Sequence, residues 1–329
     1  LTMNDIEPPA EHSDKCQILP AHQPVILAAL EALETFAGPD IDRSMAALLL
    51  SYGLRGARLQ VVLSLDDRSQ APHRWLGLRT DALRVILLHN AAVNLLPMRA
   101  GELTFPWLAA RELKLPMSRA VVCLMWMRLQ DVAVLAALGL AMWPSLSLSV
   151  RMTGLLALLL SWHGGWYVLK RVLTSQTSFT SPPALTGWRK LANKLREALL
   201  EPAHHRPAAW GLTMANWSVK LAAGACLLSA ISQSPWSAAW GGALGGELAA
   251  IFPLQGPAGF GTYEAGVWAG MAALLPAKAT ALSHAVSAAL ALHVCFLICA
   301  LMAAAMAFLL KPPTRSASSQ EGSPPGHPD

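Results

Sequence analysis

A base and an acid interrupt a hydrophobic stretch at 90–111, NAAVNLLPMRAGELTFPWLAAR. The apolar residues that end at Leu96 are followed at once by Pro97, Arg99 and Glu102, before a second short apolar piece begins. Ionisable groups at such a break are costly in a bilayer unless they face protein or water. Broken helices are tolerated at membrane depth only where they line an enclosed cavity. The pattern predicts a cavity that binds a polar group.

A second break in the chain resembles the first. The stretch 251–264 reads IFPLQGPAGFGTYE, and 94–102 reads NLLPMRAGE; each joins an apolar helix end to a proline, a glycine turn and a glutamate. Paired interruptions in the two halves of a chain are typical of a transporter's binding site. Two unrelated loops that share helix breakers are the alternative. A glutamate in apolar surroundings in both copies favours an inverted repeat.

The composition indicates that a membrane surrounds these breaks. The 329 residues are 54% hydrophobic and 14% charged, whereas a soluble domain has about 25% charged residues. The basic residues flank the apolar runs, which is the positive-inside pattern and does not suggest a nucleic-acid partner. Four of the five cysteines lie in apolar runs without metal-ligand spacing, so we expect them to be small buried hydrophobic residues.

The expected fold is an all-α, polytopic transmembrane helical bundle with two broken, re-entrant hairpins. A tail with a short amphipathic helix at 24–36 occupies 1–40, the membrane domain 41–310, and a disordered tail 311–329. The expected spans are 41–65, 120–143, 150–168, 208–231 and 280–310, with the interrupted hairpins at 83–110 and 239–275.

The charge of the connections predicts how the chain is oriented. The connections 111–119 and 169–206 are basic, whereas the turns near 145 and 235 carry no charge. The basic pair should be cytoplasmic, and Lys311 and Arg315 should place the C-terminus on the cytoplasmic side of the cytoplasmic (inner) membrane.

The largest connection, 169–206, contains a basic segment with an apolar stripe at helical spacing. We expect this segment to lie on the anionic inner leaflet, with a solvated linker helix as the alternative. The residues expected to contact anionic lipid are Arg189, Lys190, Lys194 and Arg196.

Two further groups of charges fall inside apolar runs. Arg55 and Arg58 share a helix face with Tyr52, and either reach the headgroup layer or face a polar interior. Arg128 and Asp131 are three residues apart and can pair on one face.

At these residues the chain resembles a known family. NLLPMRAGE (94–102), MRLQD (127–131) and FPLQGPAGFGTYEA (252–265) are similar to signature stretches of the lysylphosphatidylglycerol synthase transmembrane-region family, the flippase-type membrane portion of aminoacyl-phosphatidylglycerol synthases. The resemblance covers about 41–310. Carried over by position, it implies a set of cavity residues: Asn94, Pro97, Arg99, Gly101, Glu102, Arg128, Asp131, Gly259, Gly261 and Glu264.

The resemblance and the residue types favour a translocator of a polar lipid or lipid-linked molecule. Arg99 offers a fork suited to phosphate, Glu102 and Glu264 would hold Arg99 or contact an amine, and Gly259 and Gly261 would let backbone N–H groups approach an anion. A transferase that uses Glu102 or Glu264 as general base, and a structural subunit without transport, are the alternatives.

No cofactor or metal is expected from the sequence. There is no H-E-x-x-H or Walker loop. His163, His284 and His293 have no partners at metal-ligand spacing, so we expect core or interfacial histidines. A homo-oligomer is compatible with the sequence.

Overall fold

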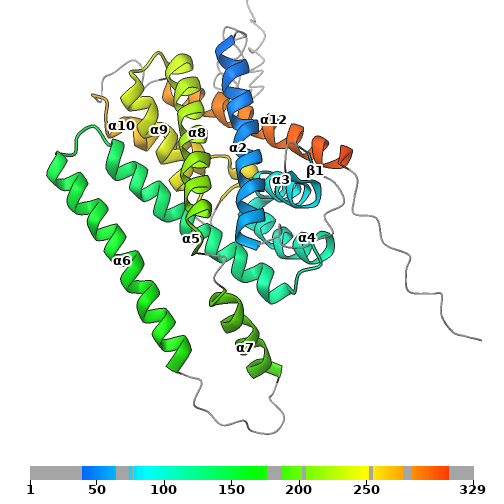
Figure 1. Ribbon diagram of the computed structural model, residues 1–329. Helices are drawn as coiled ribbons and strands as arrows, with labels where there is room; N and C mark the ends of the chain where they lie inside the picture. The colour runs from blue at the N-terminus through cyan, green and yellow to red at the C-terminus, as the bar shows by residue number, and fades with distance from the viewer. Residues whose placement is uncertain are drawn as a thin grey trace, which may run out of the picture.

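The computed structural model describes residues 39–63, 74–75, 78–175, 187–201, 205–251, 255–276 and 284–310 (Figure 1). The expected all-α class is confirmed: within these ranges the only strands are β1 (Arg74–Trp75) and β2 (Leu78–Arg79), which pair antiparallel. The expected amphipathic helix at 24–36 and the tail 311–329 lie outside the described residues.

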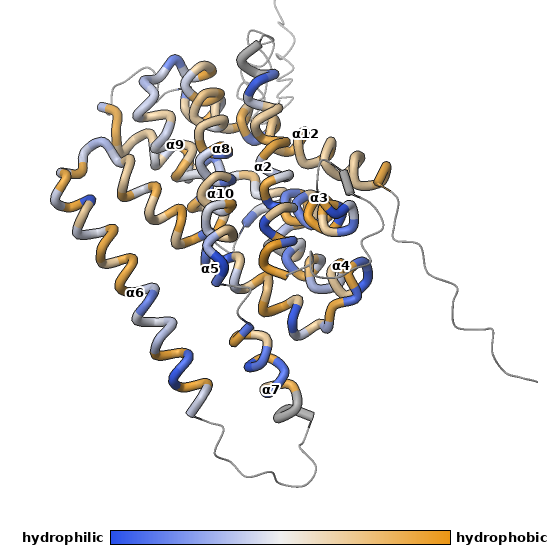
Figure 2. Tube along the Cα trace, in the orientation of Figure 1, coloured by the Kyte–Doolittle hydropathy of each residue, from blue (hydrophilic) through white to orange (hydrophobic). Residues whose placement is uncertain are grey.

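Four of the described helices are long and apolar enough to cross a bilayer, which indicates a multi-pass membrane protein (Figure 2). They are α5 (Met117–Met142), α6 (Leu148–Ser175), α8 (Pro207–Ser232) and α12 (Ala285–Leu309). All four fall where spans are expected from the sequence. The expected span at 41–65 is helix α2 (Pro39–Leu63), which is not among the four by length and composition. Two of its arginines, Arg55 and Arg58, lie well inside the helix.

The first interrupted segment folds back on itself as a hairpin of α3 (Thr80–Leu95), the short 3-10 helix η2 (Pro97–Leu103) and α4 (Thr104–Glu112). Helix α3 ends because the residue before Pro97 is driven into an extended conformation, and Leu96 has φ −83° and ψ 139°. A Cβ at Gly101 would lie 2.3 Å from the Ala92 carbonyl oxygen. Only a glycine therefore allows η2 to lie this close to α3.

The second interrupted segment is a tighter hairpin of α9 (Trp236–Ala249), η5 (Pro257–Gly259) and α10 (Thr262–Ala272). A Cβ at Gly270 would lie 2.0 Å from the Gly241 carbonyl oxygen, so the two backbones touch. Small residues four apart allow such packing between apolar helices. The breaks η2 and η5 also pack against each other, and α3 packs against η5. The two interruptions thus meet in space, as the similarity of their sequences predicts.

The remaining helices enclose these hairpins. Helix α2 runs beside α8, and a core of buried apolar residues joins them to α9, α10 and α12 (Figure 1). Helix α6 has no buried residue, and its contacts with α5 and α8 include aromatic rings and, near its start, Arg151. The ring of Trp162 lies 5.4 Å from that of Trp126 and 4.7 Å from that of Trp210. Most of α6 therefore presents apolar side chains to its surroundings.

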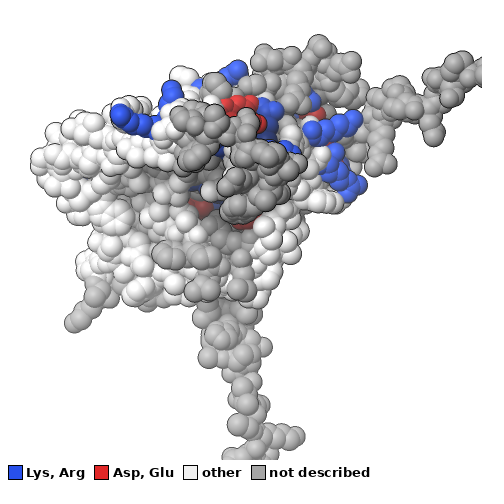
Figure 3. Space-filling view, turned by 90° about the horizontal axis from the view of Figure 1, so that it is seen from below, with Lys and Arg blue, Asp and Glu red and all other residues white. Residues whose placement is uncertain are grey.

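The ends of several helices lie close together on one side of the molecule. Arg119, in the first turn of α5, forms an ion pair with Glu201, which follows α7 (Gly187–Leu199). Arg84 donates to the Leu310 carbonyl oxygen over 3.1 Å and lies 3.5 Å from Glu112. Figure 3 views the molecule from below, and Lys and Arg gather along one edge of that face. The expected cytoplasmic connections and the end of α12 are thus neighbours.

Candidate functional site

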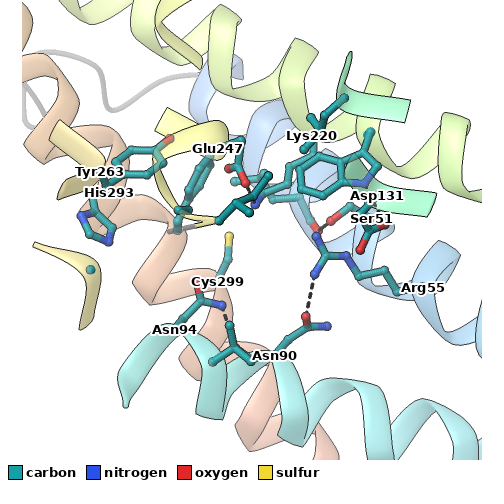
Figure 4. A pocket seen from close by; sticks show the side chains of 18 of the residues that line it. Ser51, Arg55, Asn90, Asn94, Asp131, Lys220, Glu247, Tyr263, His293 and Cys299 are labelled. Atoms are coloured by element: carbon teal, nitrogen blue, oxygen red, sulfur yellow. Dashed lines mark hydrogen bonds and ion pairs between the residues drawn. The ribbon is translucent and has the colours of Figure 1, made fainter. Parts of the chain in front are cut away.

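A cavity of about 170 Å³ lies among the broken hairpins and the long helices (Figure 4). Residues from α2, α3, α5, α8, α9, α10 and α12 line it. Four of the expected site residues are in its wall: Asn94, Arg128, Asp131 and Gly259. The wall also contains polar residues that were not expected there: Ser51, Arg55, Asn90, Trp217, Lys220, Glu247, Gln255, Tyr263 and His293.

Asp131 is the centre of a buried network. Its Oδ1 accepts from Arg58 Nη1 over 2.6 Å and from Trp217 Nε1 over 2.9 Å. Arg58 also donates to the Met127 carbonyl oxygen over 2.6 Å. Only 3% of Arg58 is exposed, so this arginine faces the interior and does not reach the headgroup layer. The expected pair of Arg128 and Asp131 is present at 3.5 Å, but Arg58 is the closer partner of the carboxylate.

Glu102 joins the first break to α5. Its carboxylate lies 2.7 Å from Arg128 Nη2 and accepts from Arg128 Nε over 3.2 Å, a two-point contact with the guanidinium. His89 Nε2 lies 3.7 Å from the same carboxylate. The backbone of Arg99 is in η2, but its side chain lies outside the described residues. The expected role of Arg99 therefore remains a prediction, and the described partner of Glu102 is Arg128.

Arg55 is held by neutral groups. It donates from Nη1 to Asn90 Oδ1 over 2.6 Å and from Nε to Asn216 Oδ1 over 3.2 Å, and its guanidinium lies 5.5 Å from the Trp217 ring centre. Within the part of the chain that the structure describes, no carboxylate lies within the 4.0 Å of an ion pair with Arg55. A partly buried guanidinium with only amide partners leaves a positive charge at the cavity wall (Figure 4).

Donors without acceptors surround the same cavity. Both asparagine oxygens face Arg55, so the amide nitrogens point elsewhere, and Asn90 Nδ2 is buried without a hydrogen-bond partner among the described residues. The buried hydroxyl of Tyr263 has no partner among those residues either. Asn90 and Tyr263 both line the cavity. Buried polar groups normally find partners, so these two donors beside the cavity are exceptions to that pattern.

Lys220 and Glu247 form a second ion pair in the cavity wall. Lys220 Nζ lies 2.7 Å from Glu247 Oε2, and 5.3 and 5.1 Å from the ring centres of Trp217 and Phe296. The pair ties α8 to α9. Its two charges cancel, unlike the charge of Arg55.

Glu264 lies at the second break, as expected, but its described partner is His293. Its Oε2 accepts from the backbone N–H of Gly261 over 2.6 Å, and its Oε1 lies 2.7 Å from Nδ1 of His293 on α12. Gly259 and Gly261 have φ of +83° and +84°. The Gly261 amide, which was expected to face an anion, is thus already bonded to Glu264. His293 was expected to be a core or interfacial histidine; it is buried, lines the cavity and has an acidic partner.

The sequence held signals for some of the residues that were missed. Asn90 and Asn94 are four apart, and Asn94 Nδ2 donates to the Asn90 carbonyl oxygen over 2.7 Å. Lys220 and Glu247 are single charges in apolar spans, which marks a functional candidate. Their pairing across 27 residues is visible only in the fold.

The charges around the cavity can be counted from these contacts. Arg58 and Arg128 are balanced by Asp131 and Glu102, and Lys220 by Glu247. Arg55 has no ion-pair partner, and the Glu264 carboxylate meets His293, which is charged only when it is protonated. The described residues contain no group of three or more His, Cys, Asp or Glu side chains placed to hold a metal ion.

Comparison of the chain with protein-family models, with curated proteins and with solved structures gave no match.

Proposed function

We propose that this protein binds the phosphodiester headgroup of a membrane lipid in the cavity and moves it across the cytoplasmic membrane. The observation that carries the proposal is Arg55, a guanidinium in the cavity wall whose partners are two amide oxygens. A phosphodiester carries one negative charge and would balance it. Guanidinium groups bind phosphate oxygens through a planar fork of donors.

The unsatisfied donors support the same ligand class. A phosphate group has several acceptor oxygens, and Asn90 Nδ2 and the Tyr263 hydroxyl each need one acceptor. The cavity, at about 170 Å³, is smaller than the roughly 300–1,000 Å³ of sites that hold drug-sized ligands. A small polar headgroup is therefore the part of a lipid that we expect it to hold, with the acyl chains in the surrounding lipid.

The setting of the cavity supports movement in addition to binding. The cavity lies where two interrupted hairpins meet among helices long enough to cross a bilayer. Transporters place their sites at such paired breaks. The resemblance to the lysylphosphatidylglycerol synthase transmembrane-region family points to the same function and to the inverted repeat.

We also propose that α7 lies on the anionic inner leaflet. Lys194 is exposed and Arg196 half-buried, whereas the side chains of Arg189 and Lys190 lie outside the described residues. Leu195 and Leu199, on the apolar stripe, are half-buried. The ion pair of Arg119 with Glu201 holds the end of this segment beside the start of α5. All of these basic residues then face the cytoplasm.

The two alternatives explain less of the site. A transferase would need a free carboxylate in the cavity, but Glu102 is paired with Arg128 and Glu264 with His293. A purely structural role accounts for the balanced pairs around Asp131 and Glu102. It does not account for the unbalanced charge of Arg55 or for the donors beside it.

Reconstitution into vesicles tests the proposal. Fluorescent phosphatidylglycerol in the inner leaflet should become accessible to an impermeant quencher faster with the protein than in empty vesicles. Arg55→Gln should remove the acceleration, and Arg171→Gln, which removes an exposed charge at the end of α6, should retain it. Covalently altered lipid would instead indicate a transferase. Lipid movement no faster than in empty vesicles would favour a structural role without transport.

A further inference from the structure

One contact ties the tip of the second hairpin to the last helix. Glu264 uses one carboxylate oxygen to cap α10 at Gly261 and the other to meet His293 on α12, at 2.6 and 2.7 Å. Both side chains are more than nine-tenths buried. The proposed function does not use this pair.

The hydrogen bond defines which nitrogen of His293 can bind a proton. A carboxylate only accepts, so Nδ1 must carry the hydrogen of this bond. In the neutral ring, Nε2 is then a bare acceptor, and it has no hydrogen-bond partner among the described residues. A Cβ at Gly259 would lie 3.7 Å from Nε2, and both Gly259 and His293 line the cavity. A proton in the cavity can therefore reach Nε2.

The rings beside His293 hold the imidazole in place. The ring of Phe260 lies 4.7 Å away and that of Tyr263 4.8 Å away, both tilted. The imidazole therefore stays against Glu264 whether or not Nε2 is protonated. Protonation changes the charge of the cavity wall without requiring a change of rotamer.

Charge links this proton to the proposed anion. The charged or titratable side chains that share the cavity wall with His293 are Tyr52, Arg55, Arg128, Asp131, Lys220, Glu247, Tyr263 and Cys299. The cation among them without an ion-pair partner is Arg55, and beside the cavity the Glu264 carboxylate meets a neutral His293. An anion bound at Arg55 would leave that carboxylate unbalanced, and a proton on His293 would restore the balance.

We infer that His293 is a proton-binding site coupled to the headgroup site, so that the cavity takes up an anionic headgroup together with a proton. The inference rests on the proposed function. The proton binds at Nε2, Nδ1 keeps its hydrogen on Glu264, and the imidazolium formed is balanced by the Glu264 carboxylate. Because coupling between two sites is reciprocal, a proton strengthens headgroup binding by the same factor by which a headgroup strengthens proton binding.

Calorimetric titration of the purified protein with short-chain dihexanoylphosphatidylglycerol tests this coupling. Titrations in buffers of different ionisation enthalpy give the number of protons taken up. A phosphodiester keeps its charge between pH 5 and 8, whereas histidine titrates there. Wild type should take up as much as one proton per lipid, and its affinity should fall with rising pH by at most about tenfold per unit.

Two variants separate the coupling from the binding. His293→Gln, which can still donate to Glu264, should bind with a pH-independent affinity and no proton uptake. Glu264→Gln keeps a hydrogen-bond acceptor but loses the charge that balances the imidazolium, so its uptake should require a lower pH; this variant provides the test if His293→Gln does not fold. Wild-type binding without proton uptake, or uptake retained in folded His293→Gln, would overturn the coupling alone. No wild-type binding at any pH would overturn both the coupling and the headgroup site.

Discussion

Asp131 illustrates what a single buried carboxylate does in this molecule. It meets Arg58 at 2.6 Å and the Trp217 indole at 2.9 Å, and Arg128 lies at 3.5 Å. Two guanidinium groups thus share one carboxylate, and the closer of them, that of Arg58, is buried. Removing one member of such a cluster leaves a buried charge without its partner, which costs far more than a surface pair contributes.

Asp131→Asn should therefore destabilise the fold, by about 3–5 kcal/mol. Asp42→Asn, which removes an exposed charge from the same set of helices, should change stability by no more than about 0.5 kcal/mol. Thermal unfolding of both variants in detergent measures the difference. Equal stability of the two variants would mean that the Asp131 network does not hold the helices together.

At the residue scale, the sequence predicts which face of a helix a charged side chain lies on, but not which residue it pairs with. The spacing of Arg128 and Asp131 placed them on one face, and the structure confirms that they are close. The stronger partner, Arg58, is 73 residues away. Helical periodicity says which side of a helix is polar, but the pairing of polar sides depends on how the helices pack.

At the scale of elements, glycines on the facing sides of α9 and α10, among them Gly241 and Gly270, set the distance between the two helices of the second hairpin. Ala in place of Gly270 would put a Cβ 2.0 Å from the Gly241 carbonyl oxygen, so the helices would have to separate. Such overpacking costs about 1–3 kcal/mol or more. Since the hairpin carries Glu247 and Glu264, separation would also disturb the cavity.

Gly270→Ala should lower the unfolding temperature in detergent. Gly164→Ala is the matched control, because a Cβ at that position of α6 meets nothing within 4 Å. The control should be neutral or slightly stabilising, since alanine favours a helix. A Gly270→Ala protein as stable as the control would contradict the close approach of the two helices.

The elements were more predictable than their contacts. The expected spans 120–143 and 208–231 appear as α5 (Met117–Met142) and α8 (Pro207–Ser232), because long apolar runs and proline breaks are local signals. The first break begins at Pro97 as expected. The contact between η2 and η5 joins segments about 160 residues apart, and only the similarity of their sequences suggested it.

At the scale of the whole molecule, all the basic connections are expected to face one side of the membrane. The turn between α5 and α6 is uncharged, whereas the segment that contains α7 is basic. The positive-inside rule then puts the turn outside and α7 inside.

Labelling of introduced cysteines in cells with an impermeant thiol reagent measures this orientation, with the wild-type protein as background for its native cysteines. Ser147→Cys, in the turn after α5, should react in intact cells. Asn193→Cys, on the exposed side of α7, should react only after permeabilisation, and Leu195→Cys should stay protected because it faces the leaflet. Reaction of Asn193→Cys in intact cells would reverse the orientation, and free reaction of Leu195→Cys after permeabilisation would make α7 a solvated linker.

The central claim is that the unbalanced charge of Arg55 binds a lipid phosphodiester. Titration of the purified protein with dihexanoylphosphatidylglycerol at a fixed pH measures it most directly. Arg55→Gln should weaken binding by about tenfold or more, because a hydrogen bond to a charged group contributes about 1.5–3 kcal/mol. Arg171→Gln should bind as the wild type does. If Arg55→Gln bound this lipid with unchanged affinity, the cavity would not be the headgroup site.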